Sequence, residues 1–138
     1  MLNLVLFEPE IPSNTGSIIR LSSNMGISLH LIKPFGFEMT DKRLRRAGLD
    51  YKELARVVEY DNFDHYINEA KQIRLFAVSS KASQYYTKVK YQENDSFIFG
   101  PETHGLPKEM LGKYVGITLP MQKGSRSLNL SNCVSIVA

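Results

Sequence analysis

The sequence has one cysteine, no tryptophan and no long hydrophobic run. A lone cysteine, Cys133, excludes an internal disulfide and favours a reducing, cytoplasmic setting. The apolar stretch at residues 1–7 is short, lacks a basic leader and runs directly into Glu8. We therefore expect a strand there rather than a signal peptide or a membrane span. The net charge of +3 is too small to indicate a nucleic-acid partner by itself.

Three common kinds of functional site also find no support. Gly16 stands alone after the first apolar stretch, so the glycine-rich dinucleotide fingerprint is absent. The three histidines, His30, His65 and His104, are far apart in the sequence, and we expect no metal site. No serine stands in a nucleophile elbow with a histidine partner, which argues against a serine hydrolase.

The 138 residues, 43% of them apolar, predict one globular domain across residues 1–138. Strands are predicted at residues 2–7, 29–32, 57–58, 73–78, 97–99 and 115–119, with helices at 13–26, 41–48, 62–70 and 108–111 and a last one opening within 125–132. This alternation favours an α/β fold: a mostly parallel sheet with helices on both faces.

The first predicted helix illustrates the local signals. Ser13 or Asn14 is expected to cap its start, and Gly26 to end it. Ile18, Leu21 and Met25 follow helical spacing and are expected to face the core.

Two polar turns follow the last two predicted strands. Residues 100–107 hold two glycines and two prolines, which fix the backbone tightly. Residues 120–132 are rich in hydroxyl and amide side chains that can cap a helix or hold a ligand. Because ligands of open α/β sheets bind at strand ends, we expect the functional site between these turns.

Three segments together resemble the three motifs of the SPOUT class of knotted RNA methyltransferases. They are Asn14-Thr15-Gly16 with Arg20, the loop at residues 99–107, and the run at residues 127–132. Within that class, residues 8–12 and 42–51 are most similar to the small single-domain enzymes that methylate the ribose 2′-hydroxyl of the anticodon wobble nucleotide. The resemblance covers nearly the whole chain.

The resemblance implies a fold that patterning alone does not predict, with a trefoil knot in the C-terminal part. It also implies a homodimer, S-adenosylmethionine as methyl donor and the tRNA anticodon stem-loop as substrate. Members of the class continue through a longer last helix, so we expect that helix to be cut short at Ala138.

The resemblance also assigns site residues. The implied donor pocket comprises Val78, Gly100, Leu119, Met121, Ser127 and Leu128. These types suit adenine, which needs an apolar slot and backbone partners. Glu102 is expected either to take a polar or basic group of the donor or to brace its loop.

Arg20 is the residue that the class assigns to the reacting hydroxyl. A guanidinium stays protonated in proteins, so our hypothesis is that Arg20 grips the adjoining phosphate and stabilises developing alkoxide charge. Asn14 and Asn129 would orient it, and Ser127 would help to seat the substrate. The alternative is that Arg20 is simply a solvated helix residue.

Cations and aromatic residues are the expected RNA contacts. The cationic set is Lys42, Arg43, Arg45 and Arg46. It would bind the RNA backbone through release of counterions, or be no more than a solvated helix face. Tyr85, Tyr86 and Tyr91 could stack on bases, with core packing expected for at least one of them. Two other functions stay open: methylation of another RNA site or of a protein side chain, and RNA binding without catalysis.

Overall fold

The computed structural model describes residues 2–39, 57–70, 73–122 and 128–138. Within these ranges the strands are β1 (Asn3–Phe7), β2 (Ser28–Ile32), β3 (Val57–Tyr60), β4 (Leu75–Val78), β5 (Ser96–Phe99) and β6 (Val115–Ile117). The helices are α1 (Pro12–Met25), α4 (Phe63–Glu69), α5 (Lys108–Lys113) and α6 (Leu130–Val137), with a short 3-10 helix, η1 (Tyr86–Lys88). The predicted α/β alternation is confirmed.

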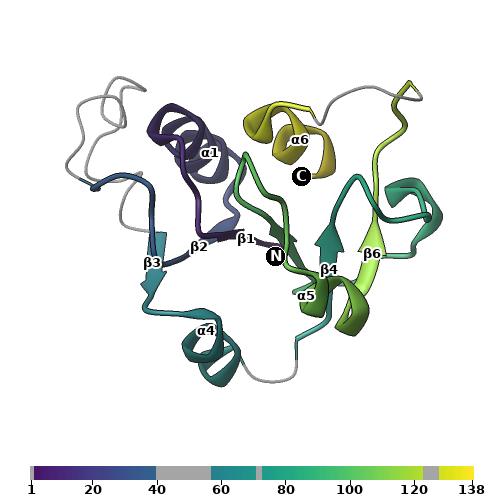
Figure 1. The fold of residues 1–138 in the computed structure, drawn as a ribbon, viewed down its shortest axis with the longest axis horizontal. Helices are drawn as coiled ribbons and strands as arrows, with labels where there is room; N and C mark the ends of the chain where they lie inside the picture. Colours follow the sequence, from purple (N-terminus) through teal and green to yellow (C-terminus); the bar gives the residue numbers. More distant parts are fainter. Residues whose placement is uncertain (1, 40–56, 71–72, 123–127) are drawn as a thin grey trace.

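The strands form one parallel sheet in the order β3-β2-β1-β5-β4-β6 (Figure 1). The centre pairs strands that are distant in sequence, with Leu4 of β1 in register with Leu29 on one side and Phe97 on the other. Every strand runs in the same direction, so the carboxyl ends of β4, β5 and β6 open at one edge. That edge is where the two predicted polar turns begin.

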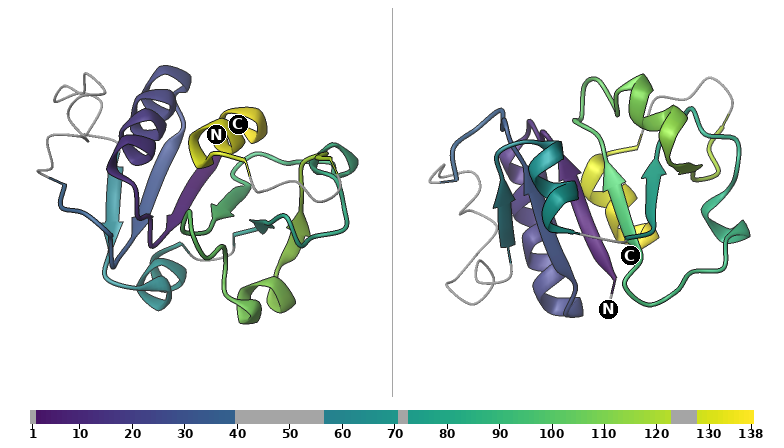
Figure 2. Two further views of the ribbon diagram at one scale, coloured as in Figure 1. Left: turned by 45° about the horizontal axis from the view of Figure 1, so that its top comes forward. Right: turned by 90° about the horizontal axis from the view of Figure 1, so that it is seen from below.

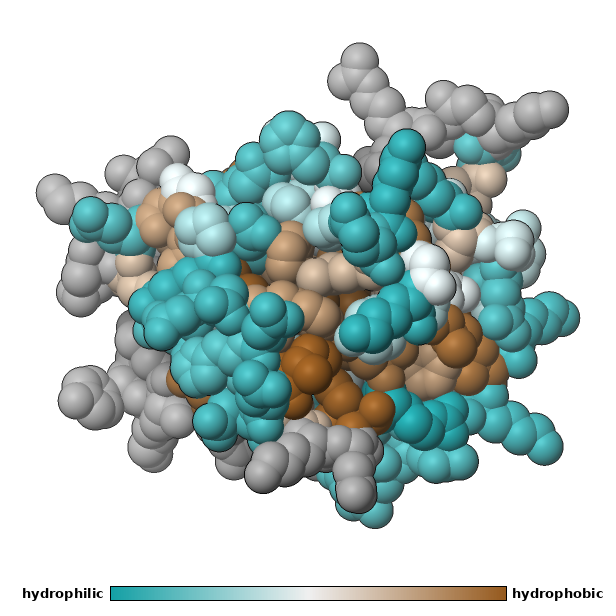
Figure 3. All heavy atoms as spheres, turned by 60° about the horizontal axis from the view of Figure 1, so that its bottom comes forward, coloured by the Kyte–Doolittle hydropathy of each residue, from teal (hydrophilic) through white to brown (hydrophobic). Residues whose placement is uncertain are grey.

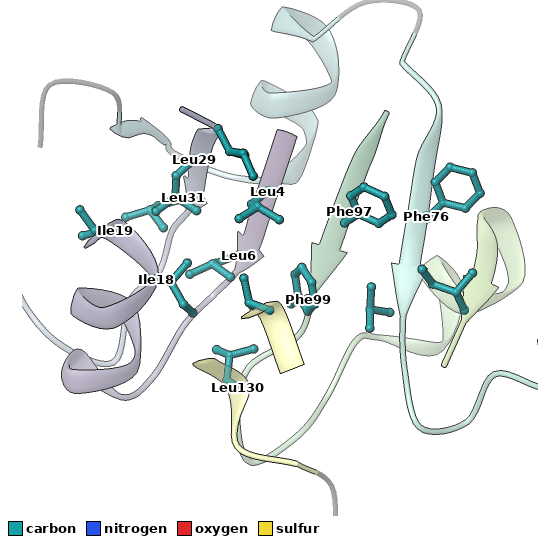
Figure 4. Packing of buried hydrophobic residues seen from close by; sticks show 14 of the residues in the cluster. Leu4, Leu6, Ile18, Ile19, Leu29, Leu31, Phe76, Phe97, Phe99 and Leu130 are labelled. Atoms are coloured by element: carbon teal, nitrogen blue, oxygen red, sulfur yellow. The ribbon is translucent and has the colours of Figure 1, made fainter. Parts of the chain in front are cut away.

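Helices cover both faces of the sheet, as predicted: α1 and α6 lie side by side on one face, and α4 and α5 lie on the other (Figures 1 and 2). Alternate strand residues point to each face. The cluster under α1 and α6 includes Leu4, Leu6, Ile18, Ile19, Leu29, Leu31, Phe76, Phe97, Phe99 and Leu130 (Figure 4). The cluster under α4 and α5 includes Val5, Ile32, Tyr66, Ala77, Ile98, Leu106 and Met110.

The face that carries α4 and α5 shows hydrophobic surface among hydrophilic residues (Figure 3). The partly buried apolar residues packed on its cluster include Phe63, Ile67, Leu111 and Tyr114. This cluster is therefore only partly covered by the two short helices.

Helix α1 begins earlier than predicted. Its first residue is Pro12, and the N-cap position is Ile11, which makes no side-chain capping bond. The prediction that Ser13 or Asn14 caps the helix is therefore wrong, because Pro12, whose fixed φ and missing N–H suit the first helical position, already starts the helix before them. Gly26, with φ of 68°, ends the helix as predicted.

The predicted buried face of α1 is only partly correct. Ile18 is fully buried, but Met25 is 48% exposed, and the fully buried Ile19 is the residue that the spacing missed. Among the tyrosines, Tyr86 is half-buried and packs against the cluster under α1 and α6, which confirms core packing for one of them. Tyr91 contacts Phe76 and Phe97 edge-on but is 36% exposed.

Some predictions fall beyond what the structure describes. The predicted helix at residues 41–48 lies outside the described residues. The segment 123–127, which joins β6 to α6, is also outside them, and the trefoil knot stays a prediction. Across the described ranges, no helix combines the length and the apolar character needed to cross a membrane.

Candidate active site

A cavity opens where β4, β5 and β6 end. Its volume of about 420 Å³ is within the usual range for small-molecule sites. The predicted site residues that line it are Asn14, Val78, Gly100, Glu102, Leu119, Met121, Leu128 and Asn129. The structure thus brings together segments that are more than 100 positions apart in the sequence. The two predicted turns and the start of α1 form its walls.

Two predicted catalytic residues are not placed at this cavity by the structure. Arg20 is an exposed residue of α1 and does not line the cavity. It stands six positions after Asn14, about 9 Å further along the helix axis and on a different side of the helix. Ser127 lies outside the described residues, as do the predicted RNA-binding cations Lys42, Arg43, Arg45 and Arg46.

The cavity wall is apolar where the strands end. Val78 and Leu119 are buried beside the last residues of the sheet, while Leu128 is 42% exposed and forms part of the rim. The strand ends are held by backbone bonds, including one from the Ser79 amide to the Ile117 carbonyl, at 3.0 Å. An apolar slot bordered by fixed main chain is the arrangement expected for a nucleoside base.

Gly100 allows the loop after β5 to fold back on itself. A Cβ at this position would lie 2.4 Å from the carbonyl carbon of Gly105 and from the amide nitrogen of Leu106. Gly105 has φ of 68°, and its amide donates to the Pro101 carbonyl at 2.9 Å. Both glycines are therefore needed for the shape of the loop.

The side chains of Asn14 and Asn129 join the first turns of α1 and α6. The Asn129 amide nitrogen donates to the Asn14 side-chain oxygen at 3.1 Å, and Asn14 is only 7% exposed. The Asn129 side-chain oxygen accepts from the backbone of Ser131 and Asn132, at 3.0 and 3.3 Å, so Asn129 also caps α6. One side chain thus fixes both the helix and its neighbour at the cavity.

Glu102 braces two backbone segments. Its carboxylate oxygens accept from the amides of Glu10 and Ile11, at 2.7 and 3.2 Å. These amides precede the first residue of α1, where a negative charge is favoured by the helix dipole. Of the two roles expected for Glu102, the geometry favours the brace.

Several cavity residues were missed in the sequence. They are Ile11, Ser79, Ser80, Lys81, Thr103, His104 and Cys133. In the sequence, neither the residues after β4 nor Cys133 belongs to a motif that would assign them to a site. Burial raises the pKa of the Cys133 thiol to about 11. Among the described residues, no group of three or more His, Cys, Asp or Glu side chains could hold a metal ion.

Comparison with known proteins agrees with this geometry. The model of the family described as SpoU rRNA Methylase matches residues 1–138. A tRNA (cytidine(34)-2′-O)-methyltransferase of Yersinia pestis is 52% identical over 145 residues, covering 99% of this chain and 90% of the relative. These matches confirm the resemblance stated from the sequence.

Solved structures show the same fold. One, described as "Structural insights into the 2-OH methylation of C/U34 on tRNA", has a TM-score of 0.94 and 38% identity, covering 99% of this chain and 91% of its own. Another is the SpoU methyltransferase AviRb of Streptomyces viridochromogenes in complex with the cofactor AdoMet, with a TM-score of 0.86 and 19% identity. It covers 99% of this chain and 55% of its own, and this likeness concerns the fold alone.

Proposed function

The chain belongs to the SpoU rRNA methylase family, and we propose that it methylates the ribose 2′-hydroxyl of the wobble nucleotide of tRNA anticodons, with S-adenosylmethionine as donor. The observation that carries the proposal is the meeting of three distant motifs at one cavity at the strand ends. Relatives named as tRNA (cytidine(34)-2′-O)-methyltransferases support the choice of acceptor over a ribosomal one.

The cavity fits the donor in size and in the chemistry of its walls. Val78, Gly100, Leu119, Met121 and Leu128 would hold the adenosine part between apolar side chains and strand-end main chain. When bound, S-adenosylmethionine supplies a methyl group activated by a sulfonium sulfur. Ser127 is proposed to complete the pocket beside Leu128.

The protein's task is then to present the ribose oxygen to the methyl carbon and to help it to lose its proton. Holding the two atoms in line can contribute on the order of 7–11 kcal/mol to the lowering of the barrier. In the proposed mechanism Arg20 remains a cation, binds the adjoining phosphate and stabilises the negative charge that develops on the oxygen. The proton passes to phosphate or water. The Asn14–Asn129 pair holds the wall against which the acceptor is seated.

The position of Arg20 favours a homodimer in which this residue serves the cavity of the second copy. Within one chain Arg20 and Asn14 lie on different sides of α1, so the helix cannot direct both side chains into one cavity. An exposed arginine on a helix that packs beside α6 is suitably placed to reach across to a neighbour.

The remaining parts of the proposal concern the substrate and the setting. The anticodon stem-loop would be bound through Lys42, Arg43, Arg45 and Arg46, which makes RNA affinity fall as the salt concentration rises. A tRNA substrate and a single cysteine favour the cytoplasm. The continuous six-stranded sheet supports one catalytic domain across residues 1–138.

The direct test is a labelled-donor assay with total tRNA, followed by mapping of the modified nucleotide. The proposal requires label on the 2′-oxygen of the wobble nucleotide. Label at another RNA position or on protein would replace the acceptor, and tRNA binding with no detectable donor binding would replace catalysis with RNA binding alone.

Replacing Arg20 tests its role. Arg20→Ala and Arg20→Lys should each lower turnover about a hundredfold or more while leaving donor affinity within twofold, because lysine keeps the charge but not the planar fork. Lys88→Ala, a change to an exposed cation of η1, serves as the control and should retain full turnover. Near-normal turnover of Arg20→Lys would contradict the assigned role.

Subunit mixing tests whether Arg20 crosses to the second copy. Arg20→Ala chains co-expressed with Gly100→Ala chains can form mixed dimers with one intact cavity facing one intact Arg20. Recovery of activity in the mixed dimer, relative to either variant alone, supports action across the interface. No recovery would place Arg20 at the cavity of its own chain.

A further inference from the structure

Two turns at the cavity are joined by a reciprocal pair of carboxylate contacts. The first turn, residues 8–11, follows β1, and the second, residues 100–106, follows β5. Glu102 of the second turn accepts from the amides of Glu10 and Ile11, at 2.7 and 3.2 Å. Glu10 of the first turn accepts from the amide of Thr103 at 2.9 Å and from its hydroxyl at 2.7 Å. We call this four-residue arrangement the clasp.

The first turn is fixed from the side opposite the cavity. The Glu8 amide donates to the Ile32 carbonyl at 2.9 Å, and Glu8 has φ of 49°. The Gly36 amide donates to the Pro9 carbonyl at 2.9 Å, and a Cβ on Gly36 would lie 2.8 Å from the Cα of Glu10. The backbone of Glu10 is thus held against the segment after β2, so its carboxylate starts from a fixed point.

Backbone contacts fix the base of the second turn, but these contacts do not hold its tip. Gly100, Pro101 and Gly105 close the base through the backbone contacts described above. The tip carries Thr103 and His104, both exposed and both at the cavity rim. The clasp is therefore what ties the tip to the rigid first turn.

We propose that Glu10 and Thr103 are positioning residues for the donor cavity, which set the distance between its two opposing walls. Ile11 and Asn14 stand on one side of the clasp and Gly100 to Leu106 on the other, and all of these line the cavity. The inference rests on the proposed function, because it takes the cavity to be the donor site. Neither residue needs to touch the donor, since each acts through the loop that it holds.

The chemistry of the contact between Glu10 and Thr103 indicates that it is strong enough to fix the position of the loop. The bonds from the Thr103 hydroxyl and amide lower the pKa of Glu10, so the carboxylate is ionised and a full acceptor at neutral pH. A charged acceptor makes stronger hydrogen bonds than a neutral one. The threonine contributes two donors from one residue, which fixes the orientation of the loop as well as its distance.

Thr103→Val is the sharpest variant, because it removes the hydroxyl and keeps the branched shape and the backbone amide. The readout is the dissociation constant of S-adenosylhomocysteine, measured by titration calorimetry, which does not depend on turnover. We expect Thr103→Val and Glu10→Ala to weaken this binding by about tenfold each. Thr103→Ser, which keeps the hydroxyl, should stay within twofold of the unmodified protein.

Controls separate positioning from general damage. Thr87→Val and Glu69→Ala change exposed residues outside the cavity and should leave the affinity unaltered. Affinity for tRNA without donor, measured by filter binding, should remain within twofold in every variant. The double variant of Glu10→Ala with Thr103→Val should lose little more than Glu10→Ala alone, because the acceptor of the Thr103 hydroxyl is then already absent.

Each outcome decides the matter. Unchanged affinity in Thr103→Val, or an equal loss in Thr103→Ser, overturns the clasp while the proposed function stands. A parallel loss of tRNA affinity and melting temperature in Thr103→Val overturns it as well, since the role would then be structural. If the unmodified protein fails to bind S-adenosylhomocysteine, the proposed function fails first and the clasp with it.

Discussion

At the amino ends of β4 and β5 a charged pair closes the sheet, whereas at their carboxyl ends the chain leaves a cavity. Asp95, whose side chain is 2% exposed, receives the Arg74 guanidinium at 3.2 Å and the Gln92 amide at 2.7 Å. Its carbonyl also accepts from the Asn3 amide, which ties β1 to the same point. The two charges of this pair neutralise each other.

The carboxylates of the cavity end are used differently. Glu10 and Glu102 bond mainly to backbone amides of the opposite turn, so they shape loops instead of neutralising a cation. The comparison shows that the two ends of one sheet have different roles: contacts at the amino ends secure the fold, and contacts at the carboxyl ends hold two loops in a fixed position relative to each other. Changes at the two ends should therefore have separable effects on stability and on donor binding.

Gly100→Ala should give the largest effect at the cavity end. The added Cβ meets backbone atoms at 2.4 Å, which cannot move as a side-chain end would, so the loop must shift. We expect S-adenosylhomocysteine to bind about a hundredfold more weakly, in line with the upper range of overpacking costs, about 1–3 kcal/mol. Calorimetry measures this. Gly112→Ala is the matched control, because a Cβ there meets nothing within 4 Å; equal affinities for the two variants would refute the prediction.

Asp95→Ala should give the largest effect at the amino end. It removes the acceptor of a charged contact and of a backbone amide, and should lower the free energy of unfolding by about 2 kcal/mol. Arg74 is 41% exposed and can turn to water, which limits the loss. Urea unfolding measures the change, and Asp61→Ala, a side chain 79% exposed, should cost under about 0.5 kcal/mol. If Asp95→Ala lowers the free energy of donor binding by more than it lowers the free energy of unfolding, the two ends do not have separate roles.

The reactivity of Cys133, which lines the cavity, tests how far the cavity end shields a side chain from solvent. Because the Cys133 thiol has a pKa of about 11, a far smaller fraction of it is thiolate at pH 8 than in a free cysteine. The greater nucleophilicity of that thiolate only partly offsets the resulting loss of reaction rate. We expect iodoacetamide to react about tenfold more slowly than with the urea-unfolded chain, and the rate to rise with pH up to about 11. Mass spectrometry follows the reaction. A rate equal to that of the unfolded chain at pH 8 would contradict the burial of the thiol.

His30 should give the smallest effect, on the pH dependence of stability. It lies between Tyr60 and Tyr66, its ring nitrogens face the Tyr60 hydroxyl and the Asn3 side-chain oxygen, and burial lowers its pKa. The unfolded chain therefore takes up a proton before the fold does, and stability falls as the pH drops from about 6.5 through the lowered pKa.

The variant His30→Gln removes this titration. Its melting temperature should fall less than that of the unmodified protein between pH 7.5 and 5.5, with a difference of roughly a few degrees. Every other side chain is the same in both proteins, so the comparison isolates His30. The same pH dependence in both proteins would show that His30 is not the group responsible.

Much of the fold was predictable from local pattern. Apolar runs and turn residues placed the strands, and their alternation with helices predicted a parallel sheet covered on both faces. The errors, at the start of α1 and on its predicted buried face, came from features that the hydrophobic pattern does not indicate. Pro12 started α1 without a side-chain cap, and Met25 fitted the apolar spacing but stayed at the surface, because spacing does not show where the neighbouring layer ends.

The site was predictable only in part. Strand ends and the motif resemblance located the cavity residues Val78, Gly100, Leu119 and Asn129, since each stands at or near the end of an element. The contact between Glu10 and Thr103 spans 93 positions, and no periodicity or local motif can indicate such a pair. The run at residues 8–12 held the relevant signal, but only as an unexplained part of the resemblance.

The strand order has a consequence for how the protein is made. Asn3 of β1 is in register with Ser96 of β5, so β1 lacks one of its two neighbours until β5, far later in the chain, has been translated. Such distant pairing slows folding. Leu130 of α6 adds a wall of the cavity later still, so a nascent chain has no complete cavity until α6 has been made.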